Sequence, residues 1–255
     1  MQIAVGIAFA ALVAGLAYRT RALSISGAVT AFAVGAIVFG SGGWRAAAVL
    51  FAFFLPSTVL TQIGRTRKRA IVQAHGETSR NGWQVLANGG VAAVCALLAA
   101  RGNATFAAAF AGAFAAASAD TWGTEIGTLS GRGPVSILTL RPLPAGRSGG
   151  VTPLGLIATV AGALCVAAAA ALVGIAPFWR VAIGGVTGAV FDSILGASAQ
   201  ALRWCEVCAC ECETRHHGCG ATTVLRRGVE WIENDAVNFA ATLCGALVAA
   251  LTSSL

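Results

Sequence analysis

The sequence predicts an all-α polytopic membrane protein with about eight transmembrane helices, and three observations carry this prediction. Of its 255 residues, 57% are apolar and 11% are charged, whereas soluble domains carry about 25% charged residues. Eight apolar stretches are long enough to cross a hydrocarbon layer of ~30 Å. The six tryptophans fall at or just beyond the ends of these stretches, where membrane proteins place an aromatic belt.

The expected spans leave no room for an independent soluble domain, so residues 1–255 form a single integral membrane domain. The spans run over residues 1–17, 24–40, 45–63, 83–100, 104–119, 153–175, 179–198 and 234–252. Arginines follow the first span rather than precede it, which indicates a retained helix and not a cleaved signal peptide. Ala and Gly are frequent in the later spans, and small residues let transmembrane helices pack closely.

The basic residues indicate how the spans are oriented. Fourteen of the seventeen Lys and Arg lie in the odd-numbered gaps between spans, and the other three are Arg45, Arg101 and Arg180. Because cytoplasmic loops are enriched in basic residues, we expect the odd gaps in the cytoplasm and both termini on the non-cytoplasmic side. The net charge of +7 therefore reports topology and not a nucleic-acid partner. The basic run 65–69 suits contact with anionic membrane lipids.

Short echoes along the chain point to a four-plus-four internal repeat. Such echoes also arise by chance in Ala- and Gly-rich sequences, so both explanations stay open. The paired segments are 26–30 with 148–152, 84–88 with 234–238, and 61–64 with 124–127.

Polar residues within spans are the most informative feature, because each costs ~2.5–3.5 kcal/mol or more at the bilayer centre. They gather at the cytoplasmic ends of spans four to eight. The acids, which we expect to be catalytic, are Asp120, Glu125, Asp192 and Asp235. Neighbouring residues that we assign to substrate or nucleotide binding are Arg80, Asn81, Gln84, Asn88, Thr124, Arg141, Arg147, Gly149, Gly150, Thr152, Ser193, Gln200, Asn234 and Asn238.

Helix caps and interface anchors explain such residues one at a time, and for single residues such as Ser118 or Asn81 we favour that explanation. They do not explain several carboxylates next to arginines. Mg²⁺ is usually held by one or two carboxylates together with substrate phosphates, so we expect it at Asp120, Asp192 and Asp235.

Phosphate oxygens have expected ligands in the same region. Arg80, Arg141 and Arg147 would clamp them through charged hydrogen bonds. The amides of Gly149 and Gly150, at the start of span six, would add an anion site reinforced by the helix dipole.

Five motifs lie at the polar ends of the spans: RNGWQVLANGG from residue 80, SADTWGTEIG from 118, GGVTPLG from 149, FDSILGASAQ from 191 and NDAVNF from 234. Together they resemble the family of transmembrane protein 19 and the phytyl-phosphate kinases, over nearly the whole chain. The resemblance implies phosphoryl transfer from a nucleoside triphosphate, with CTP favoured, to an isoprenoid monophosphate. Similar kinases recycle phytol toward tocopherol. The expected location is a prokaryotic cell membrane, or the plastid envelope in a eukaryote.

The residues themselves fit this chemistry. A phosphate monoester has a second pKa near ~6, so the attacking oxygen is already largely anionic at neutral pH. Phosphoryl transfer then depends on positioning and charge neutralisation, which acids and arginines supply without a general base.

The segment 199–233 is a cysteine-rich loop, expected in the cytoplasm, where disulfides are rare. Cys205, Cys208, His217 and Cys219 offer four soft ligands for a structural Zn²⁺ and resemble the family's Cys pair and later His/Cys pair. Cys210 and Cys212 are competing ligands. A metal-free, redox-sensitive loop is the alternative.

Two other functions remain open on sequence grounds. A small-solute transporter would also have many helices and intramembrane polar residues, but its site normally lies near the midplane. A lipid cytidylyltransferase would use CTP and release pyrophosphate.

Overall fold

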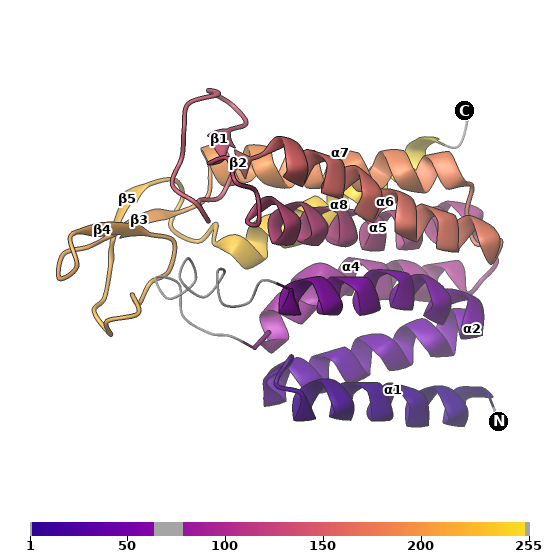
Figure 1. The fold of residues 1–255 in the computed structure, drawn as a ribbon. Coiled ribbons are helices and arrows are strands. Elements are labelled where there is room, and N and C mark those ends of the chain that lie inside the picture. Colours follow the sequence, from indigo (N-terminus) through magenta and orange to yellow (C-terminus); the bar gives the residue numbers. More distant parts are fainter. Residues whose placement is uncertain (1, 64–78, 253–255) are drawn as a thin grey trace.

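The computed structural model describes residues 2–63 and 79–252, in which seven helices run side by side (Figure 1). The helices are α1 (Gln2–Arg19), α2 (Ile25–Gln62), α4 (Gly82–Ala99), α5 (Ala104–Gly127), α6 (Pro153–Leu172), α7 (Phe178–Ser198) and α8 (Asn234–Leu251). Their bounds follow the expected spans closely, except that α5 continues to Gly127 instead of ending at 119. Asp120 and Glu125 therefore lie on the last turns of a helix and not beyond it. The basic run 65–69 lies outside the described residues.

Helix α2 contains two of the expected spans, 24–40 and 45–63, joined at Gly43. This glycine has φ 59° and ψ −149°, which no helical residue adopts. A straight helix of 38 residues would be ~57 Å long. Both ends of α2 nevertheless meet Arg80, since the Ser24 amide donates to its carbonyl (3.0 Å) and its guanidinium donates to Thr61 (3.5 Å). The chain therefore reverses direction at Gly43.

Five helices are long and apolar enough to cross a membrane: α2, α4, α6, α7 and α8. The apolar helical stretch of α1, Ala4–Arg19 among the described residues, is shorter than these five helices. The total of eight spans and the internal repeat stay predictions.

Helix α5 forms the centre of the bundle and packs against α2, α4, α6, α7 and α8. Small residues make this possible. A Cβ on Gly112 of α5 would lie 2.5 Å from the carbonyl oxygen of Gly245 in α8, so the two backbones touch. The expected close packing through Ala and Gly is confirmed here.

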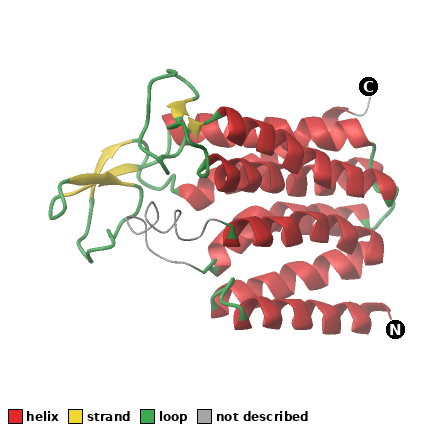
Figure 2. Cartoon of the chain, viewed as in Figure 1, coloured by secondary structure: helices red, strands yellow, loops and turns green. Residues whose placement is uncertain are grey.

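All strands lie at one end of the bundle, and both termini lie at the other (Figures 1 and 2). A two-stranded pair joins β1 (Val135–Ser136) to β2 (Gly150–Val151). A three-stranded antiparallel sheet has the order β4 (Cys210–Cys212), β3 (Leu202–Cys205), β5 (Val224–Arg227). The all-α prediction missed these strands because two to four residues are too few to show a periodicity.

Two of the three arginines outside the odd gaps cap helix ends far from the strands. Arg45 donates to the carbonyls of Val173 and Gly174, just beyond α6. Arg180 donates to the carbonyls of Ala249 and Ala250 in the last turn of α8 (3.2 and 3.0 Å). Basic side chains stabilise helix C-termini in this way.

Candidate functional site

Three of the predicted catalytic acids lie near one another at the strand end of the bundle. Asp120 and Glu125 come from α5, and Asp192 comes from α7, which packs against it. Asp120 interacts electrostatically with both Glu125 and Asp192. The Oδ2 atom of Asp192 is buried and has no hydrogen-bond partner among the described residues. A buried carboxylate oxygen without a partner is costly, so this pair of acids suits a bound cation.

Arg80 faces the same acids and is held firmly. Its amide donates to the carbonyl of Ala22 (3.1 Å), and its carbonyl accepts from Ser24 (3.0 Å). Its guanidinium contacts the hydroxyl of Thr61, which in turn donates to Glu125 at 2.7 Å. It also interacts electrostatically with Glu125 and Asp120. We call Arg80, Thr61, Glu125, Asp120 and Asp192 the Arg80 corner.

An apolar groove opens beside this corner. Its walls come from α1, both halves of α2 and α4, and it encloses about 1250 Å³ free of protein atoms, part of which is open solvent. Most of its lining residues are Ala, Gly, Val, Leu and Phe. The polar lining residues are Thr58, Thr61, Gln62, Arg80, Gln84 and Asn88. The groove therefore has an apolar body and a polar mouth that carries a positive charge.

Several predicted ligands serve as helix caps. Asn81 and Gln84 form a reciprocal capping box at the start of α4, with both hydrogen bonds at 3.0 Å. Thr152 caps α6 by accepting from the Gly155 amide (3.0 Å). The side-chain Nδ2 of Asn88 donates to the Gln84 carbonyl one turn earlier (2.9 Å). For Asn81 the capping explanation is confirmed.

Arg147 lies in a second group of polar residues, which we call the Arg147 corner. Its guanidinium forms ion pairs with Glu211 and, at 3.9 Å, with Glu213. Glu213 also accepts from the amide and hydroxyl of Ser148 (2.9 and 2.5 Å) and from the Gln200 side chain (3.0 Å). Two glutamates of the cysteine-rich loop thus neutralise a predicted phosphate ligand.

Helix α7 ends at Ser198, so Gln200 lies in the following loop and not on the helix that carries Asp192. Sequence reasoning missed Glu211 and Glu213. Glu211 lies in β4 and Glu213 just after it, and their alternation with Cys210 and Cys212 is a local signal that both acids point to the same side.

The remaining predicted residues are more dispersed. The Gly150 amide donates to the Arg147 carbonyl (3.1 Å), so it closes a turn. Arg141, Thr124 and Asn234 are exposed, whereas Ser193 and Asn238 are partly buried on α7 and α8. Asp235 lies in the first turn of α8, where its electrostatic neighbour is Glu233.

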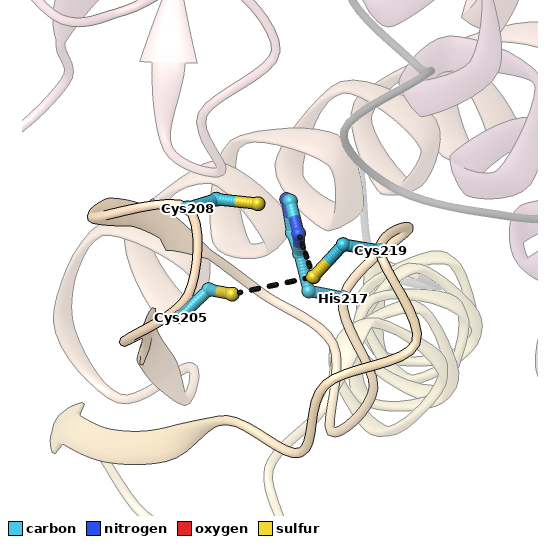
Figure 3. Close-up of side chains that lie close together, drawn as sticks. All are labelled: Cys205, Cys208, His217 and Cys219. Atoms are coloured by element: carbon cyan, nitrogen blue, oxygen red, sulfur yellow. Dashed lines mark hydrogen bonds between the residues drawn. The ribbon is translucent and has the colours of Figure 1, made fainter.

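The four predicted zinc ligands converge in the cysteine-rich loop. Figure 3 shows the side chains of Cys205, Cys208, His217 and Cys219 directed toward one another, with all ligand atoms within 4.8 Å. The Sγ atoms of Cys205 and Cys219 are 3.7 Å apart. Tetrahedral zinc with Zn–S bonds of ~2.3 Å would separate sulfur ligands by about 3.8 Å. The residues therefore fit this metal.

The cysteines that competed for the metal in sequence are outside this group. His217 directs Nδ1 toward Cys219 Sγ (3.3 Å) and Nε2 toward Cys210 Sγ (3.6 Å). Cys210 is thus placed to orient the imidazole from behind, as outer partners of metal-bound histidines do. The hydrogen bond with His217 lowers the pKa of Cys219 to about 6. Interaction with Cys219 raises the pKa of Cys208 to about 12.

Comparisons with known proteins agree with the motifs. Residues 8–246 match a family model described as integral membrane protein DUF92. Protein PGR of Arabidopsis thaliana is 29% identical, covering 95% of this chain and 93% of the relative. Membrane proteins described as uncharacterized in Synechocystis and Methanocaldococcus jannaschii are 27% and 26% identical, covering 86% and 91% of this chain and 78% and 87% of theirs. No solved structure matches.

Proposed function

This chain belongs to the DUF92 family of integral membrane proteins, and on that premise we propose that it is a kinase acting on isoprenoid phosphates. It transfers a phosphoryl group from CTP, or another nucleoside triphosphate, to an isoprenoid monophosphate and forms the diphosphate. The reaction takes place at the membrane face that carries the Arg80 corner.

The observation that carries this proposal is the position of Arg80. It lines the polar mouth of an apolar groove and interacts with the acids of α5. An isoprenoid monophosphate has a matching shape, with an apolar tail and an anionic head. Guanidinium groups bind phosphate oxygens through paired, charged hydrogen bonds.

Asp120 and Asp192 are the residues that would hold Mg²⁺, because the buried Oδ2 of Asp192 lacks a partner among the described residues. When bound with a nucleoside triphosphate, the ion neutralises charge on the transferring phosphates. Asp235 is a third, more distant candidate at the start of α8.

The residues of the Arg80 corner position the acceptor. At neutral pH the acceptor phosphate is already largely anionic, so no side chain needs to remove a proton. Arg80 binds the acceptor phosphate and offsets its charge, while Thr61 and Glu125 fix the direction of the guanidinium. The groove keeps the tail out of water and aligns the head with the acids.

The proposal includes a topology of eight spans, with the strand end in the cytoplasm and both termini outside. A structural zinc ion in the cysteine-rich loop completes it. An introduced cysteine in segment 79–82 should stay protected from an impermeant thiol reagent in intact cells. Labelling there would contradict this orientation.

The function is tested with purified protein, Mg²⁺, CTP or ATP labelled in the γ-phosphate, and a panel of isoprenoid alcohols and monophosphates. A kinase places the label in the isoprenoid diphosphate and releases CDP or ADP. Label in pyrophosphate would instead identify a cytidylyltransferase. Label that remains in the triphosphate with every acceptor would refute the kinase and leave the transporter.

A further inference from the structure

The end of the groove opposite Arg80 is closed by aromatic rings. Phe9 of α1 and Phe39 and Phe51 of the two halves of α2 line this end. Trp44, next to the reversal at Gly43, packs edge-on against Phe39 (ring centroids 4.7 Å apart) and Phe9 (5.5 Å). Phe9 also packs edge-on against Phe51 (5.5 Å). We call these four residues the aromatic stop.

The aromatic stop packs directly against α1. A Cβ placed on Gly6 would lie only 2.0 Å from the Phe39 ring. The ring therefore rests directly on the α1 backbone, and a larger residue at position 6 would displace it. Edge-to-face ring contacts are favourable beyond the burial of the rings, so the four rings stabilise one another.

The length of the groove follows from the helices that form it. Thr61 at the mouth and Phe51 at the stop are ten residues apart on one helix, which corresponds to ~15 Å. Arg80 is held at the mouth by its backbone hydrogen bonds to Ala22 and Ser24. The head group and the tail end are thus both fixed by rigid elements.

We propose that the aromatic stop sets the longest isoprenoid tail that the groove accepts. This inference rests on the proposed function, because it takes the lipid phosphate to be bound at Arg80. Each methylene buried on the way to the stop improves affinity about fourfold. A tail that exceeds the groove must fold back or leave it, so the gain ends at the stop.

Two substitutions with opposite effects test the proposal. Phe39→Ala removes a ring from the stop and lengthens the groove, whereas Ala31→Phe places a ring in the groove lining nearer its mouth. Phe178→Ala is the matched control, because Phe178 packs on Trp179 of α7 and does not line the groove. Thermal unfolding in detergent verifies that each variant is folded.

The measurement is competition of farnesyl, geranylgeranyl and longer isoprenoid monophosphates against a labelled one, without nucleotide. We expect Phe39→Ala to raise the affinity ratio of longer to shorter tails about tenfold or more, Ala31→Phe to lower it, and Phe178→Ala to leave it unchanged. If the wild type binds these lipids but neither groove variant shifts the ratio, the stop is refuted while the proposed function stands. If the wild type binds none of them, the proposed function itself fails.

Discussion

Two arginines that the sequence places in equivalent roles have different surroundings in the fold. Arg80 contacts the Thr61 hydroxyl and faces the acids of α5 at the mouth of an apolar groove. Arg147 forms ion pairs with Glu211 and Glu213, and Glu213 also takes the hydrogen bonds of Ser148 and Gln200. The position of an arginine near a helix start therefore does not distinguish the two residues, and only the fold shows that Arg147 is paired with glutamates of the cysteine-rich loop. The Arg147 corner joins the cysteine-rich loop to the bundle, whereas the Arg80 corner lies at the mouth of the apolar groove.

The acids of the Arg80 corner give the largest expected effect. Asp120→Asn and Asp192→Asn should lower turnover by ~10²–10³, because each removes a charge from a preorganised electrostatic site. The assay is phosphoryl transfer to an isoprenoid monophosphate across a Mg²⁺ titration. Glu230→Gln is the control, since Glu230 is an exposed acid of the strand end.

Asp235→Asn should lower turnover less than the other two substitutions. The charge that acts on Asp235 is that of Glu233, and not that of Asp120 or Asp192. Near-normal rates for the Asp120 and Asp192 variants at low Mg²⁺ would show that these acids are structural.

The two arginines themselves come next. Arg80→Ala should raise the KM for the isoprenoid monophosphate by roughly 10- to 100-fold, since a hydrogen bond to a charged group contributes about 1.5–3 kcal/mol. Arg147→Ala should leave this KM close to the wild-type value and lower the midpoint of thermal unfolding. The reverse pattern would exchange the roles of the two corners.

Zinc is expected to have a structural role in the cysteine-rich loop and no role in the Arg80 corner. Purified protein should contain about one zinc per chain, and Cys205→Ser should lose it, because structural sites need all four ligands. Cys165→Ser is the control, as Cys165 lies in α6. Zinc affinity should fall on acidification, since protons compete for the thiolates. Metal analysis that finds no zinc in protein prepared without chelator would favour the free-thiol loop.

The glutamates of the Arg147 corner give the smallest effects. Glu213→Gln should lower the unfolding free energy by about 1.5–3 kcal/mol, because Glu213 is largely buried and accepts several hydrogen bonds. Glu211 is more exposed, so its ion pair contributes less.

The Arg147 guanidinium lowers the pKa of Glu211 below its usual 4.5. Its stabilising effect is therefore complete above pH 4.5 and lost as the pH falls through the lowered pKa. Glu211→Gln should flatten the acid limb of the stability curve in this range. An unchanged limb would show that the ion pair contributes nothing measurable.

Local patterns in the sequence predicted much of this architecture. Apolar stretches predicted the helices, with bounds close to those observed except at the end of α5, and the residues Cys205, Cys208, His217 and Cys219 form the cluster that their spacing predicted. Pairing between distant residues was not visible. Arg147 and Glu211 are 64 positions apart, and no periodicity links them.

The groove was also beyond reach of the sequence, because it depends on the reversal at Gly43. That reversal brings Phe39 and Phe51 together at one end and places Thr61 beside Arg80 at the other. Apolar residues on three helices look alike in sequence whether they pack tightly or leave a space.

Photo-crosslinking tests most directly whether the groove at Arg80 holds the lipid. An isoprenoid monophosphate with a photoreactive group at the end of its tail is bound to the wild-type protein, irradiated, and the labelled peptides are identified. The account predicts labelling near Phe9, Phe39 and Phe51, with loss of labelling in Arg80→Ala and retention in Arg147→Ala. Labelling confined to α6 and α7, or labelling that survives Arg80→Ala and disappears in Arg147→Ala, would contradict it.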